Sequence, residues 1–191
     1  MKKLIKLVIF VLLILAFIYL GTKEYHNKVK KNINNDIASD MLLDNETVFI
    51  ETNHSKVLSK LSSKNNFILY ACIDANKLCT KYGLLINDVA KENGINDIFY
   101  YDFKNDREEN NGTYQKILSK LSDYLMTDDL GNQDLHAPTL IFFKNGLVYS
   151  FDDSLSEYRG NFNVDDVWTE EQINIKKTYL TEVMKGFSLN E

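Results

Sequence analysis

The 191-residue sequence contains one proline, eight glycines, two cysteines and three histidines. So little proline and glycine excludes a fibrous, collagen-like or linker-rich chain. The histidines lie far apart and no His/Cys/Asp spacing indicates a zinc site, so we expect no metal. The sequence also lacks a P-loop, a dinucleotide-binding fingerprint and a Gly-x-Ser-x-Gly elbow, and we therefore expect no cofactor.

Apolar residues make up 45% of the sequence, with eleven Phe and eleven Tyr, which predicts one folded domain plus an appendage. Charge is unevenly distributed along the chain. Residues 1–31 hold seven of the 22 Lys and Arg and a single acid, which leaves 15 basic and 26 acidic residues, a net charge of −11, in residues 32–191. An acidic body repels phosphate backbones, so we expect no nucleic-acid partner. It is also expected to stand away from an anionic lipid surface.

An unbroken apolar run over residues 7–20 predicts that residues 1–21 form a transmembrane anchor. The run is shorter than the ~20 residues that usually cross a bilayer, and its length also suits the apolar core of a secretory signal peptide. However, residues 17–22 lack the small-residue pattern of a cleavage site, and no cysteine follows the run for lipid modification. We therefore interpret the segment as an uncleaved helix that crosses the cell membrane once.

The orientation of the anchor depends on more than charge, because three lysines precede the run and four follow it within residues 1–31. The secretory-like start of the chain favours an extracytoplasmic domain. Residues 22–46 are polar and rich in Asn, Lys and Asp, which predicts a polar tether that carries the domain (residues 47–191) off the membrane.

Hydrophobic periodicity predicts an alternation of strands and helices in the domain. The expected strands are residues 47–50, 67–73, 98–101, 139–143 and 147–151, the last two flanking a Lys-Asn-Gly hairpin turn. The expected helices are residues 53–61, 76–93, 113–125 and 169–185, with a charged loop over residues 102–111. This order predicts an α/β fold in which a mixed sheet of about five strands is flanked by helices on both faces.

Two segments resemble the thioredoxin superfamily over residues 47–185. The segment Ala137-Pro138-Thr139-Leu140-Ile141-Phe142-Phe143-Lys144-Asn145-Gly146 is similar to the cis-proline loop and hairpin of that family, and Cys79-Thr80-Lys81-Tyr82-Gly83 is similar to the start of its redox helix. The resemblance implies a thioredoxin-like fold, a cis peptide before Pro138, and a loop at Ala137 and Pro138 that pairs with polypeptide substrates. The charged loop and helix over residues 101–125 are also similar to small secreted thioredoxin-like proteins known as bacteriocin-transport accessory proteins.

The sequence departs from the family at its redox motif. If Cys79 is the second cysteine of Cys-x-x-Cys, then Asn76 occupies the place of the first, the exposed nucleophile. The motif is therefore degenerate. Asparagine is a good helix N-cap, so Asn76 has a structural role available to it at the start of the redox helix. The buried acid that the family often keeps beneath the site corresponds to Tyr70, so it is missing as well.

Three interpretations of the two cysteines, Cys72 and Cys79, remain open. Both are buried apolar side chains, or they form a structural disulfide, or they are a reactive pair with a relocated nucleophile. A disulfide requires Cα atoms within ~7 Å, which a strand end and the adjacent helical turn allow.

Two functions follow from these alternatives. One is a membrane-anchored accessory or binding protein that uses a thioredoxin-like scaffold without redox turnover, acting on or with an exported polypeptide or a membrane complex. The other is a thiol–disulfide oxidoreductase or isomerase that uses Cys79 with Cys72. The loss of the first cysteine favours the accessory protein, and the sequence leaves open whether the chain is an enzyme.

Overall fold

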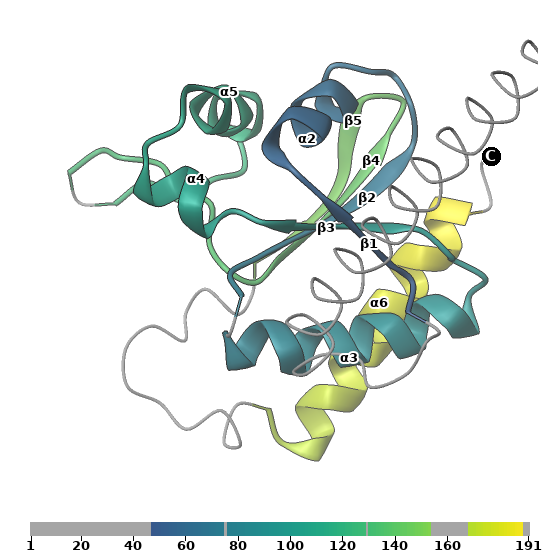
Figure 1. Ribbon diagram of the computed structural model, residues 1–191. Helices are drawn as coiled ribbons and strands as arrows, with labels where there is room; N and C mark the ends of the chain where they lie inside the picture. The colour runs from purple at the N-terminus through teal and green to yellow at the C-terminus, as the bar shows by residue number, and fades with distance from the viewer. Residues whose placement is uncertain (1–46, 75, 129, 154–167, 189–191) are drawn as a thin grey trace, which may run out of the picture. The chain divides into compact units, whose positions relative to one another are not determined.

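The computed structural model describes residues 47–74, 76–128, 130–153 and 168–188 (Figure 1). The predicted anchor, residues 1–21, and the predicted tether, residues 22–46, lie outside the described residues. Within the part of the chain that is described, no helix is long and apolar enough to cross a membrane.

Five strands form one mixed sheet with the order β1-β3-β2-β4-β5. The strands are β1 (Phe49–Thr52), β2 (Phe67–Cys72), β3 (Ile98–Asp102), β4 (Thr139–Lys144) and β5 (Leu147–Asp152). Strand β3 pairs in parallel with both β1 and β2, whereas β4 pairs antiparallel with both β2 and β5. The predicted mixed sheet is confirmed, with β2 at its centre and all six residues of that strand buried.

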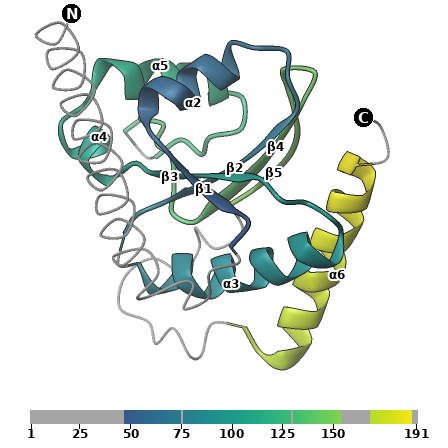
Figure 2. The same cartoon turned by 45° about the vertical axis from the view of Figure 1, so that its right-hand side comes forward.

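The helices cover both faces of the sheet. They are α2 (His54–Leu61), α3 (Lys77–Glu92), α4 (Lys104–Glu108), α5 (Gly112–Leu121) and α6 (Glu170–Ser188). Two views of the ribbon show α2 and α5 on one side of the sheet and α3 and α6 on the other (Figures 1 and 2). This arrangement agrees with the alternation of strands and helices that the sequence predicts.

The largest differences from the sequence-based prediction are in α4 and α5, whereas β1 and the end of α6 differ by two or three residues. Residues 104–108 form the short helix α4 where a loop was expected, because five residues with no buried side chain leave no apolar periodicity to detect. Helix α5 ends at Leu121 although the apolar spacing continues to Leu125. Leu125 is still buried, but it reaches the core from the turn that follows the helix.

Three of the helices begin with an asparagine cap. The side chains of Asn53, Asn76 and Asn111 accept hydrogen bonds from backbone N–H groups two or three residues further along α2, α3 and α5. These bonds satisfy donors that the first turn of a helix leaves without partners. The caps therefore fix where each helix starts relative to the strand before it.

The core between the sheet and the pair α2 and α5 is aromatic and aliphatic. Successive side chains of a strand point to opposite faces of the sheet, so the strand residues of this core alternate along the chain with those that face α3. Buried members of this core include Leu69, Ala71, Tyr101, Phe103, Tyr114, Ile117, Leu121, Ile141 and Phe143.

Candidate functional site

A disulfide joins the end of the central strand to the first turn of the next helix. Cys72 is the last residue of β2, Cys79 lies in the first turn of α3, and their Cα atoms are 5.9 Å apart. The two residues are 0% and 2% exposed. Both cysteines of the sequence are used in this bond, so the interpretation as free apolar side chains is wrong.

Asn76 stands where the first cysteine of a redox motif would be and acts there as a helix cap. Its Oδ1 accepts hydrogen bonds from the backbone N–H groups of Leu78 at 2.9 Å and Cys79 at 3.3 Å. An amide side chain cannot attack a disulfide. The residue therefore keeps the geometry of the helix start while it supplies no nucleophile.

Tyr70 fills the space beneath the disulfide. Its hydroxyl donates a hydrogen bond of 2.6 Å to the backbone carbonyl of Cys79, and its side chain is fully buried. Burial raises the pKa of Tyr70 well above its usual range, with a smaller opposing effect from the backbone N–H of Gly83. The phenol therefore stays protonated and cannot take up a proton as a buried carboxylate would.

Carboxylates gather where the parallel strands end, close to Cys72. Glu51, Asp74 and Asp102 come from β1, the residues after β2, and β3, and Asp102 is the register partner of Cys72. Tyr100 donates a hydrogen bond of 2.6 Å to Asp74. Burial is the main cause that raises the pKa of Asp102, opposed by the backbone N–H of Lys104 and assisted by the charge of Asp74.

This carboxylate edge bears on the chemistry of the disulfide. A thiolate formed at Cys72 on reduction would carry a negative charge beside residues that are already anionic, so its formation is disfavoured. The sequence analysis did not single out these three acids. Each of them lies at or just beyond the end of a predicted parallel strand, and that shared position was the signal that could have identified them.

Replacing Glu51 with glutamine is expected to raise the stability of the domain at pH 7 by only about 0.3 kcal/mol, because the side chain is exposed and solvent screens its charge. Burial, then the charges of Asp74 and Asp102, raise the pKa of Glu51. A raised carboxyl pKa means that its stabilising contribution is present at low pH and is lost as the pH rises through that pKa. The gain should therefore be seen in urea unfolding at pH 7 and should vanish in acid.

The same substitution at Glu182, on α6, is the control for the loss of one negative charge from an acidic domain. A gain at Glu51 that is equal at pH 7 and in acid, or no larger than the gain at Glu182, would contradict the electrostatic explanation.

The loop before β4 lies at the same end of the sheet. The peptide between Ala137 and Pro138 is cis, as the resemblance implies. Thr139 is the register partner of Ala71, which places the loop beside Cys72. The structure therefore brings together the predicted site residues, with Cys72 and Cys79 bonded to each other and Pro138 buried next to them.

A hollow of about 620 Å³ opens near this loop. Residues of α4, α5 and the segments 126–128 and 132–136 line it, among them Arg107, Gln115, Asp128 and His136. Several of the polar residues that line the hollow bond to one another. Asn132 donates a hydrogen bond to Asp128, and Gln115 donates one to Asn110. No group of three or more His, Cys, Asp or Glu side chains suited to a metal ion occurs among the residues that the structure describes.

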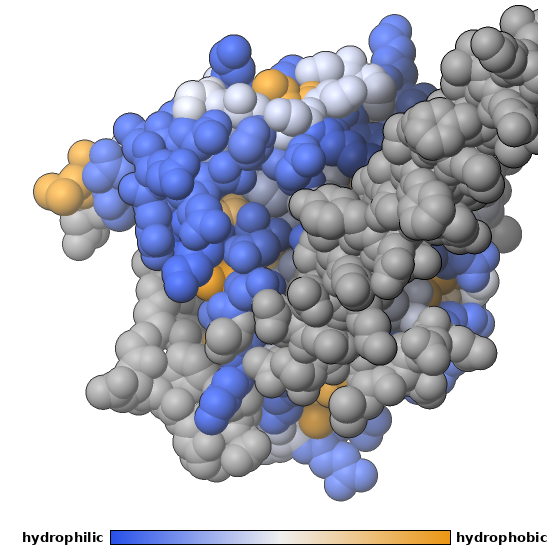
Figure 3. All heavy atoms as spheres, in the orientation of Figure 1, coloured by the Kyte–Doolittle hydropathy of each residue, from blue (hydrophilic) through white to orange (hydrophobic). Residues whose placement is uncertain are grey.

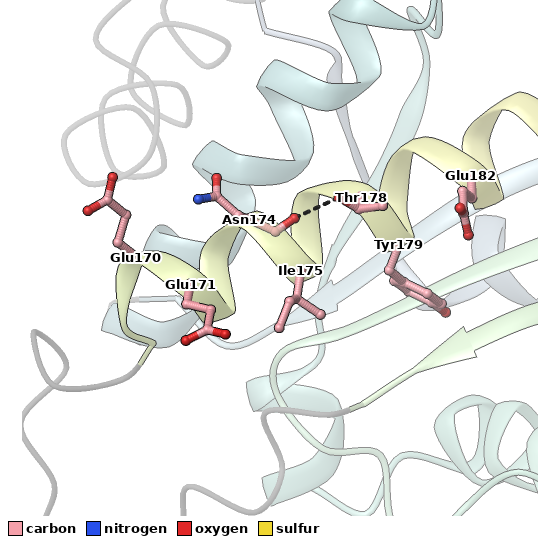
Figure 4. A pocket seen from close by; sticks show the side chains of 7 residues that line it. All are labelled: Glu170, Glu171, Asn174, Ile175, Thr178, Tyr179 and Glu182. Atoms are coloured by element: carbon pink, nitrogen blue, oxygen red, sulfur yellow. Dashed lines mark hydrogen bonds between the residues drawn. The ribbon is translucent and has the colours of Figure 1, made fainter.

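The outer surface of α6 carries a second, shallow hollow. Its lining residues are Glu170, Glu171, Asn174, Ile175, Thr178, Tyr179 and Glu182, which lie along the helix (Figure 4). In the view of Figure 3, hydrophilic residues cover most of the described surface that faces the viewer, and hydrophobic residues form small separate groups.

No protein-family model matches the sequence, and no curated protein matches it. Solved structures that resemble it are thioredoxins. Thioredoxin O2 from Arabidopsis thaliana in the oxidized state has 14% identity and a TM-score of 0.42, over 73% of this chain and 96% of its own. Thioredoxin O1 from Arabidopsis thaliana has 14% identity and a TM-score of 0.36, over 62% and 90%. Thioredoxin NaTrxh from Nicotiana alata has 10% identity and a TM-score of 0.37, over 61% and 97%.

Similarities with TM-scores below 0.5 do not indicate the activity of this chain. The thioredoxin-like character of the fold rests instead on the domain itself. The strand order β1-β3-β2-β4-β5, the directions of the strands, the helices on both faces and the cis-proline at the start of β4 together form a thioredoxin-like mixed α/β sheet.

Proposed function

We propose that the chain is a membrane-anchored, extracytoplasmic accessory or binding protein with a thioredoxin-like domain, which acts on or with exported polypeptides and does not turn over thiols. The observation that carries this proposal is the buried Cys72–Cys79 disulfide, which uses both cysteines of the sequence. Thiol–disulfide exchange requires a thiolate to approach a sulfur atom, and exposures of 0% and 2% oppose such an approach.

The same bond supports the proposed compartment. Structural disulfides form and persist in oxidising environments outside the cytoplasm. A disulfide in the domain supports an extracytoplasmic position, and the apolar run over residues 7–20 supplies the anchor in this proposal. The exported polypeptide would contact the loop at Ala137 and Pro138 and the adjacent start of α3 at Asn76, where backbone pairing by strand addition is possible.

Counting alkylated thiols by intact mass, in native and denatured protein and before and after reduction, tests the absence of thiol turnover. We expect no alkylated thiol before reduction in either state, and two after reduction of the denatured chain. We also expect no acceleration of insulin reduction by dithiothreitol. A thiol that reacts in the native protein, or an acceleration of insulin reduction, would establish instead the alternative oxidoreductase that uses Cys79 with Cys72.

The double substitution Cys72→Ala with Asn76→Cys is the positive control for that assay. It leaves the same number of cysteines and restores Cys-x-x-Cys, with the new thiol at the start of α3. Its activity would show that the scaffold can support exchange once the nucleophile is present.

Location is tested separately by protease treatment of intact cells whose wall has been removed. Before digestion, the protein should be found in the membrane fraction. Protease added to the intact cells should then degrade an extracytoplasmic domain. A domain that resists external protease until the cells are lysed would overturn the proposed orientation.

A further inference from the structure

Helices α2 and α5 contain nearly the same sequence. Residues 56–62 are Lys-Val-Leu-Ser-Lys-Leu-Ser, and residues 116–122 are Lys-Ile-Leu-Ser-Lys-Leu-Ser. In both helices the apolar positions pack on the core and the lysines fall on the remaining surface. Both helices end at the second leucine of the repeat, Leu61 and Leu121, so the repeated residues occupy the last turns of each helix.

The two helices lie side by side on the same face of the sheet (Figures 1 and 2). Their lysines, Lys56, Lys60, Lys116 and Lys120, are called the lysine face below. Three of them are exposed and Lys60 is half-buried. The ammonium groups of Lys56 and Lys60 lie 5.1 and 4.6 Å from the centroid of the Phe99 ring, which holds them at the surface without neutralising their charge.

The lysine face differs in charge from the rest of the domain. Neither α2 nor α5 contains an aspartate or glutamate, and among the described residues no carboxylate forms an ion pair with any of the four lysines. Acidic residues limit the face at the ends of α5, namely Glu108, Glu109 and Asp123. On the opposite side of the sheet, α3 and α6 together carry six lysines and five acidic residues. The pair α2 and α5 therefore carries a larger excess of positive charge than the opposite helical layer, in a body whose net charge over residues 32–191 is −11.

We propose that the lysine face docks on the anionic phosphate headgroups of the membrane in which the chain is anchored. The inference rests on the proposed anchor, residues 1–21, followed by a tether over residues 22–46. A segment of 25 residues reaches only tens of ångströms from its end, about 28 Å root-mean-square for a coil of that length, so it keeps the domain close to its own membrane. Weak attraction at a few lysines is then effective, because the encounter is intramolecular.

The acidic domain is expected to stand away from an anionic lipid surface, and docking of the lysine face limits that expectation to the other orientations of the domain. Net repulsion acts on the domain as a whole, but the excess of lysine on α2 and α5 favours one orientation at short range. The lysine face is turned to the lipid, and the layer of α3 and α6, where acidic residues nearly balance the lysines, is turned away. The loop at Ala137 and Pro138 lies at the end of β4 rather than on either helical layer, so docking of the lysine face does not cover it.

Amine acetylation followed by peptide mass spectrometry tests the proposal on the full chain in vesicles. One set of vesicles contains only phosphatidylcholine, and the other contains equal parts of phosphatidylcholine and phosphatidylglycerol. We expect the four lysines of the lysine face to be acetylated roughly fivefold more slowly in the anionic vesicles, with the difference lost near 1 M salt. Four exposed lysines on other surfaces, Lys77, Lys91, Lys104 and Lys185, serve as internal controls whose rates should not change.

Two variants with the same net charge complete the test. One changes the four lysines of the lysine face to glutamine, and the other changes the four control lysines to glutamine. Exposed Lys64, just after α2, is the reporter in both. Its slower acetylation in anionic vesicles should persist in the control variant and disappear in the lysine-face variant.

The outcomes separate this proposal from the anchor on which it rests. A chain that fails to float with either kind of vesicle lacks the anchor, and both proposals fall. A chain that floats with both but shows equal acetylation of the lysine face retains the anchor and overturns the docking alone. Protection of the lysine face by added polyglutamate, with none by anionic vesicles, would also overturn it and would indicate an acidic protein partner.

Discussion

Replacing Lys176 with methionine is expected to lower the free energy of unfolding by about 3 kcal/mol. The ammonium of Lys176, on α6, lies 2.8 and 3.0 Å from the two carboxylate oxygens of Asp152, at the end of β5. The side chains are 14% and 5% exposed. Methionine keeps most of the apolar stem but removes the cation, which leaves a negative charge in a poorly solvated position.

Tyr82 also holds the carboxylate of Asp152 in place. Its hydroxyl donates a hydrogen bond to Asp152, and the Lys176 ammonium lies 5.6 Å from the centroid of its ring. Burial, followed by the charge of Asp152, raises the pKa of Tyr82 well above its usual range. The phenol therefore remains a donor, and the three side chains join α3, β5 and α6 at one point.

Urea unfolding of three variants would measure this effect. Lys177→Met is the matched control, because Lys177 pairs with Glu92 at 2.7 Å with both side chains well exposed, and its loss should cost less than about 0.5 kcal/mol. The double variant Asp152→Asn with Lys176→Met removes both charges and should recover much of the loss. Equal effects at Lys176 and Lys177 would contradict the buried ion pair.

Local patterns in the sequence were sufficient to predict the layers of the fold. The continuous apolar run at residues 67–73 predicted the buried central strand, and the Asn-Gly turn predicted the hairpin of β4 and β5. Asn76 was expected to cap a helix and does so. These features depend on interactions between residues that are close in sequence or that share one face of an element, and such interactions leave a periodic trace.

Contacts between residues far apart in the sequence leave no such trace. Tyr82 and Asp152 are separated by 70 positions, and nothing in the order of the residues indicates that they meet. The spacing of Cys72 and Cys79 also did not distinguish between free thiols, a structural disulfide and a reactive pair. Geometry excluded the first of these, because the end of β2 and the first turn of α3 bring the two Cα atoms within bonding range.

Replacing Cys72 and Cys79 together with alanine is expected to lower the free energy of unfolding by about 2.5 kcal/mol. The bond closes a loop of seven positions, and the estimate is the chain entropy that such a closure removes from the unfolded state. Denaturant unfolding with and without dithiothreitol measures it. Reduction should destabilise the wild-type domain by a similar amount and should not change the double variant, which is its own control for effects of the reductant.

The same free energy bears on whether the bond can serve exchange chemistry. By linkage, the disulfide stabilises the fold by the same free energy by which the fold stabilises the disulfide. A stabilisation of about 2.5 kcal/mol therefore lowers the reduction potential of the disulfide by about 55 mV relative to the unfolded chain. Such a bond resists cellular thiols, as a structural disulfide should. A double variant as stable as the wild type would contradict this, because a disulfide that the fold does not favour would be as reducible as one in an unfolded chain. Cys79 would then be available for exchange, and the oxidoreductase would become the better hypothesis.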